Sequence, residues 1–123
     1  MEKPHKKLDV WQVAMAVAKT IYDLTRHFPE EEKYGLVSQM RRAAVSIPCN
    51  IAEGAARRGK KEFRNFLSVA QGSLSELDTQ LEISLMLGYL RREEIQQLWN
   101  QLIRVDKMLT SLIRSLSKSP ANG

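Results

Sequence analysis

Basic side chains gather in one stretch of the sequence, residues 39–64, where they could bind the phosphates of a nucleic acid. The stretch holds seven basic residues against two acidic ones, an excess of +5 that equals the net charge of the whole chain. A solvated helix face usually mixes both signs of charge, so uncompensated cations favour an acidic partner. The candidate binding residues, in order of expected importance, are Arg57, Arg58, Lys60, Lys61, Arg64, Arg41 and Arg42.

Binding through these side chains would neutralise phosphates without reading bases, on RNA or on DNA. The nearby aromatic residues, Phe63 and Phe66, fit a protein core better than a platform for base stacking. Sequence specificity should therefore be weak. Two alternatives stay open: the charges serve only solubility, or they dock an acidic protein.

The sequence has few residues that could perform catalysis. A nucleophile needs a base held by a third group, yet the two histidines are His5, near the N-terminus, and His27, where a helix is expected to end. The single Cys49 is expected to be a half-buried apolar side chain in a reducing compartment. We therefore predict no enzymatic activity, no cofactor and no metal site.

The N-terminal segment, MEKPHKKLD, is basic but has no apolar stretch behind it, unlike a secretory signal. No apolar run approaches the roughly 18 residues that span a membrane. These features predict a cytoplasmic protein without a membrane partner.

Apolar residues recur every three or four positions along most of the chain, a spacing typical of amphipathic α-helices. It predicts helices over residues 9–28, 33–56 and 60–87, and a fourth ending near residue 117 whose start is not defined. Short turns make sequential helices neighbours, which favours an all-α, antiparallel up-and-down four-helix bundle. We predict one domain, residues 9–117, between a flexible N-terminus, residues 1–8, and a flexible tail, residues 118–123.

Two kinds of residue should shape the second helix and the turn after it. Pro48 removes a backbone donor, so a kink is expected nearby, with Ser46 or Asn50 satisfying the freed group. Gly54 and Gly59 are expected to supply the turn into the third helix.

The last two helices carry more apolar residues than one bundle core needs. The surplus comprises Phe66, Ile83, Leu85, Leu87, Trp99, Ile103, Met108 and Ile113. A row of small residues, Ser68, Gly72, Ser75 and Thr79, would let another helix approach closely, within the bundle or between subunits. Homo-oligomerisation is the simplest way to bury the surplus.

Several short motifs resemble one known family. They include Phe28-Pro29, Tyr34-Gly35-Leu36, Arg41-Arg42-Ala43, Ser46-Ile47-Pro48, Asn50-Ile51-Ala52-Glu53-Gly54 and Glu76-Leu77, in that order. Over residues 8–90 the chain is similar to the four-helix-bundle family also called 23S rRNA intervening-sequence proteins.

The resemblance implies an all-α bundle that assembles into a ring, typically a homopentamer, with no established enzymatic activity. A related branch contains the accessory variability proteins of diversity-generating retroelements, which bind a reverse transcriptase and nucleic acid. The resemblance therefore adds a reverse transcriptase to the possible partners, as an acidic protein that the basic face would dock. One departure from the family pattern is Arg91-Arg92, where a Ser or Thr cap is more usual.

Overall fold

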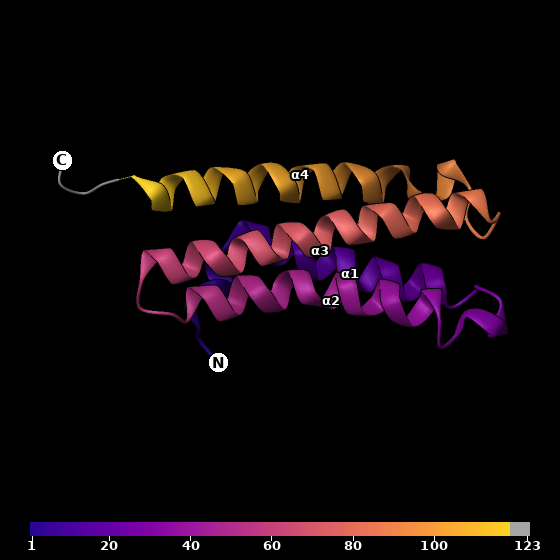
Figure 1. Ribbon diagram of the computed structural model, residues 1–123, viewed down its shortest axis with the longest axis horizontal. Helices are drawn as coiled ribbons and strands as arrows, with labels where there is room; N and C mark the ends of the chain where they lie inside the picture. Colours follow the sequence, from indigo (N-terminus) through magenta and orange to yellow (C-terminus); the bar gives the residue numbers. More distant parts are fainter. Residues whose placement is uncertain (119–123) are drawn as a thin grey trace.

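The computed structural model describes residues 1–118, which form four long α-helices and no strand (Figure 1). The helices are α1 (Asp9–Thr25), α2 (Leu36–Ala55), α3 (Lys60–Met86) and α4 (Arg92–Ser117). Two short 3-10 helices, η1 (Pro4–Lys7) and η2 (Glu30–Glu32), precede α1 and α2. The all-α prediction is confirmed.

The helices pack in sequence order, and α4 returns to lie against α1. Each runs antiparallel to the one before it (Figure 1), which is the up-and-down arrangement that short connections favour. The predicted apolar faces form the core: Ile21, Ile47 and Leu77 are fully buried. Near the helix ends, residues of the same faces, such as Leu24 and Leu116, are partly buried against that core.

The first connection is longer than predicted because α1 ends at Thr25 and α2 begins at Leu36. The Thr25 hydroxyl donates to the carbonyl of Ile21 at 2.7 Å, within the last turn of α1. The Glu32 carboxylate accepts the backbone N–H of Leu36 at 3.2 Å, so it satisfies one free donor of the first turn of α2.

Pro48 does not break α2, which continues to Ala55. The side-chain amide of Asn50 donates to the Ser46 carbonyl at 2.8 Å and to its hydroxyl at 2.9 Å. The Ser46 hydroxyl is also 2.8 Å from that of Ser73 on α3. The polar groups next to the proline therefore tie α2 to α3.

The predicted role of Gly54 is wrong, because this glycine is buried inside α2 and the turn begins after it. A Cβ at Gly54 would lie 2.9 Å from Phe63 Cδ1, 2.9 Å from Phe66 Cβ and 3.2 Å from the Phe63 carbonyl oxygen. Gly54 thus lets α3 cross α2 closely. Gly59 does belong to the turn, as the residue before α3.

Gly88 ends α3 with a positive φ of 77°, which only glycine adopts without strain. The N–H of Gly88 bonds to Leu85 and that of Tyr89 to Ser84, the two bonds of a Schellman motif. The Tyr89 hydroxyl donates to Glu32 at 2.9 Å, which joins the two connections at this end of the bundle. That hydrogen bond, with desolvation, raises the pKa of Tyr89 above its ordinary value of 10.0.

The start of α4, which the sequence left undefined, is at Arg92. The Glu94 carboxylate accepts the backbone N–H of Arg91 at 2.9 Å. Glu94, the third helical residue, therefore supplies the glutamate half of a capping box, and its own backbone N–H bonds to the Arg91 carbonyl at 3.0 Å.

The first eight residues and Lys118 lie outside the four helices. The N-terminal segment predicted to be flexible, residues 1–8, includes η1, which lies against α1 and α2. In the predicted tail, residues 118–123, all but Lys118 lie outside the described residues.

Candidate nucleic-acid interface

Five of the seven predicted binding residues lie around the connection between α2 and α3, at one end of the bundle. Arg58, Lys60 and Lys61 are exposed, and within residues 1–118 none of them forms an ion pair. Their charges are therefore free to meet a phosphate.

The other two residues of this group already have partners. Arg57 forms an ion pair of 2.7 Å with Glu53, four residues earlier on α2, and its guanidinium lies 4.9 Å from the centre of the Phe66 ring. Arg64 donates to the carbonyl of Leu116 at 2.9 Å. A cation near a helix C-terminus is attracted by the negative end of the helix dipole, so Arg64 also stabilises the end of α4.

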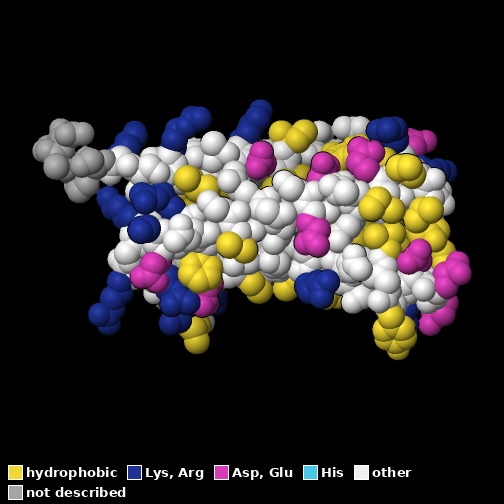
Figure 2. All heavy atoms as spheres, viewed as in Figure 1, with side chains coloured by type: hydrophobic (Ala, Val, Ile, Leu, Met, Phe, Trp, Pro, Cys, Tyr) yellow, Lys and Arg dark blue, Asp and Glu magenta, His cyan; other side chains and the backbone are white. Residues whose placement is uncertain are grey.

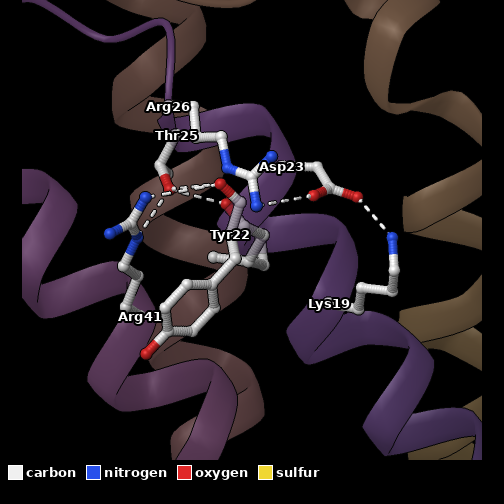
Figure 3. A network of polar contacts seen from close by, with 7 residues as sticks. Lys19, Tyr22, Asp23, Thr25, Arg26 and Arg41 are labelled. Carbon is white, nitrogen blue, oxygen red and sulfur yellow. Dashed lines mark hydrogen bonds and ion pairs between the residues drawn. The ribbon is translucent and has the colours of Figure 1, made fainter.

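The structure separates Arg41 and Arg42 from the other five, since they lie about four turns away on α2. Arg41 donates to the Thr25 hydroxyl at 3.0 Å and to the Tyr22 carbonyl at 3.4 Å, at the C-terminal turn of α1 (Figure 3). Arg41 therefore holds the end of α1, while Arg42 is exposed.

An ion-pair network lies beside this contact on α1 (Figure 3). Asp23 accepts a hydrogen bond of 2.9 Å from Lys19 and lies 3.7 Å from Arg26. The hydrogen bond from Lys19, aided by the charges of Lys19 and Arg26, holds the pKa of Asp23 below its ordinary value of 3.8. Asp23 is thus engaged with cations of its own helix.

The fold adds cations that are distant in sequence to the same end of the bundle. The N-terminus, the connection between α2 and α3, and the C-terminal end of α4 lie together there (Figure 1). We call this surface the basic end; its cations are Lys3, Lys6, Lys7, Arg57, Arg58, Lys60, Lys61, Arg64, Arg114 and Lys118. Figure 2 shows Lys and Arg side chains gathered over it.

Among residues 1–118, the carboxylates of the basic end are those of Glu2, Asp9, Glu53 and Glu62. The opposite end mixes charges, with Glu30, Glu31, Glu32, Glu93 and Glu94 beside Arg26, Lys33, Arg91 and Arg92. The positive potential is therefore concentrated at one end of the molecule. Sequence reasoning missed Lys3, Lys6, Lys7, Arg114 and Lys118, although the predicted up-and-down order already placed both chain ends beside the second turn.

A second feature, which we call the tyrosine groove, lies between α1 and α2 on the side of the bundle. Its walls are formed by Tyr22, Lys33, Tyr34, Val37, Ser38, Arg41, Arg42, Val45 and Ser46. Three of these residues are basic and none is acidic. The groove was not predicted because Tyr22 and Arg42 come from different helices.

The surplus apolar residues of α3 and α4 are largely used within the chain. Leu85, Trp99, Met108 and Ile113 pack partly buried against the core, and Trp99 also donates to Asp78 at 2.7 Å. Ile83, Leu87 and Ile103 stay exposed, together with Met86. The row of small residues that includes Gly72 faces solvent, so it does not pack within this bundle.

Other reactive residues do not converge. Cys49 is exposed, so the prediction of a half-buried thiol is wrong; its neighbour Pro48 is buried instead. The His5 ring packs edge-on against Trp11 at 5.0 Å. Residues 1–118 contain no group of three His, Cys, Asp or Glu side chains that could hold a metal ion. Within the same range, every helix is too short or too polar to cross a membrane.

The fold defines an up-and-down four-helix bundle, and its candidate site is an exposed charged surface. A family model described as 23S rRNA-intervening sequence protein matches residues 6–111, so the chain belongs to that family. The structure is also similar to a crystal structure of a protein of unknown function from the S23 ribosomal protein family of Bacteroides thetaiotaomicron VPI-5482. The two share 26% sequence identity with a TM-score of 0.78, over 85% of this chain and 95% of that chain. A search of curated proteins found no match.

Proposed function

We propose that this protein binds nucleic acid, RNA or DNA, through the basic end, largely without sequence specificity, and that it does so as a homo-oligomer. The observation that carries the proposal is that ten Lys and Arg side chains of residues 1–118 gather on one surface with four acidic side chains. The ten cations come from three separate segments. A uniform phosphate backbone suits such a surface because it requires charge and no particular base.

The side chains of the basic end support backbone contact. Arg58, Lys60 and Lys61 are exposed on a turn and the first residues of a helix, where their long side chains can follow a phosphate backbone. Phe66 lies under Arg57, and Phe63 is partly buried against the core, so neither ring is free to stack on a base. This arrangement favours charge neutralisation over base readout.

Binding should weaken steeply as salt rises. Each phosphate neutralised on duplex DNA contributes about −0.9 to the slope of log affinity against log salt, so five contacts predict a slope of about −4.5. The measurement is fluorescence anisotropy with labelled duplexes of two unrelated sequences, which should give the same slope. Failure to bind either duplex at low salt would instead favour an adaptor that docks an acidic protein, such as a reverse transcriptase.

The homo-oligomer should form through the exposed apolar residues at the end of α3. Ile83 is 40% exposed, Met86 85% and Leu87 52%, and Figure 2 shows hydrophobic side chains gathered at that end of the bundle. Apolar surface of this kind marks an association site. A ring of five copies is the assembly that the family resemblance suggests.

Light scattering on the purified protein should give a mass several times the 14.1 kDa of one chain. Replacing Ile83, Met86 and Leu87 with serine should lower that mass. Met15→Ser, at a 46% exposed residue on α1, serves as a control because Met15 is not one of the surplus apolar residues of α3 and α4. A strictly monomeric wild-type protein would contradict the proposal.

A further inference from the structure

The tyrosine groove exposes two aromatic rings away from the basic end. Tyr34 is 88% exposed and Tyr22 is 40% exposed. Along α2 the groove runs from Val37 to Ser46, about 14 Å at the helical rise per residue. The groove therefore offers flat apolar faces on a surface long enough for an extended chain.

Cations lie beside both rings. The guanidinium of Arg41 is 4.5 Å from the centre of the Tyr22 ring, and Lys33 Nζ is 5.5 Å from that of Tyr34. Arg42 is exposed in the same wall, and Ser38 adds a hydroxyl. With no carboxylate in the lining, the groove is complementary to a ligand that combines negative charge with flat rings.

We propose that the tyrosine groove binds single-stranded nucleic acid, with a base stacked on Tyr34 and phosphates beside Lys33 and Arg42. Aromatic side chains next to cations are the usual means of holding single strands, because every base has a face that can stack. A duplex hides those faces, so the groove would add affinity for single strands alone. The inference rests on the proposed function and specifies the form of nucleic acid that the protein prefers.

The test compares three ligands of equal length: an oligothymidylate, a fully abasic strand and a duplex. Tyr34→Ala should weaken binding of the oligothymidylate at least about fivefold, the loss of one stacked base. It should leave the abasic strand and the duplex unchanged. Tyr34→Phe, which keeps the ring, should bind like the wild type. Because Tyr34 is 88% exposed, its loss removes no core contact, and circular dichroism checks the fold.

Two further variants separate charge from stacking. Arg42→Glu should weaken binding of the oligothymidylate and of the abasic strand to the same extent, because both carry phosphates. Ile103→Ala, at a 54% exposed apolar residue on α4, should leave the affinity for both strands unchanged.

Several outcomes would overturn the inference. The Tyr34→Ala variant would overturn it by losing affinity equally for all three ligands, or by losing no affinity for the oligothymidylate. Displacement of the oligothymidylate from the wild type by polyglutamate, at equal charge concentration, would also overturn it. If the wild type binds all three ligands and Tyr34→Ala has no effect, the proposal for the tyrosine groove is refuted while the proposal for the basic end is retained. If the wild type binds none of them at low salt, both proposals fail.

Discussion

Reversing Arg57, Arg58, Lys60 and Lys61 to glutamate should weaken binding to duplex nucleic acid at least about a hundredfold at moderate salt. The slope of log affinity against log salt should become shallower by about 3.6, because four phosphate contacts are lost. Anisotropy titrations at several salt concentrations measure both quantities. All four side chains are exposed, so the fold should survive, although Arg57→Glu places a second carboxylate four residues after Glu53, just beyond the end of α2.

The matched control reverses four exposed cations elsewhere, Arg26, Arg91, Arg92 and Arg104. It changes the net charge equally but leaves the basic end intact, so most of the affinity should remain. Equal losses in the two variants would mean that net charge alone governs binding. Unchanged affinity in the first variant would refute the basic end as the binding surface.

The fold makes a prediction about the same surface that the charge pattern alone did not. Lys3, Lys6 and Lys7 are some fifty residues away from the turn between α2 and α3 in sequence, but they join the same basic end. Reversing these three lysines should therefore also weaken duplex binding.

Gly54→Ala should lower the free energy of unfolding by about 1–3 kcal/mol, despite the better helix propensity of alanine. The added Cβ would lie 2.9 Å from Phe66 Cβ and 3.2 Å from the Phe63 carbonyl oxygen, and both atoms are fixed by the backbone of α3. Relief of the overlap requires α2 and α3 to separate, which loses contacts between two long helices. Urea denaturation followed by circular dichroism measures the change.

Gly72→Ala is the matched control, since it makes the same substitution inside a helix. A Cβ at Gly72 meets no atom of the described chain within 4 Å, so the higher helix propensity of alanine should raise stability by about 0.5–1 kcal/mol. A gain at Gly54 as large as that at Gly72 would contradict the close crossing of α2 and α3. A loss of stability in the Gly72→Ala variant would instead indicate that the row of small residues lies in a contact between copies of the chain.

The sequence predicted the class of fold because each helix buries one apolar face. Residues such as Val17, Met40, Leu67 and Leu102 follow the helical period, and their burial requires no knowledge of which helix lies opposite. The helix ends were predicted less well: α1 stops at Thr25, and Gly54 belongs to α2 and not to the turn. Such boundaries depend on contacts with other helices, which periodicity does not report.

The sequence by itself determined that the chain forms four amphipathic helices and that its excess charge centres on residues 57–64. Tertiary structure decided which cations share a surface and which ones stabilise the fold through hydrogen bonds. It brought Lys3, Lys6, Lys7, Arg114 and Lys118 to the basic end, and it engaged Arg41 and Arg64 at the C-terminal ends of α1 and α4. Arg64 and Leu116 are 52 residues apart in sequence, so only the packing of helices could reveal their hydrogen bond.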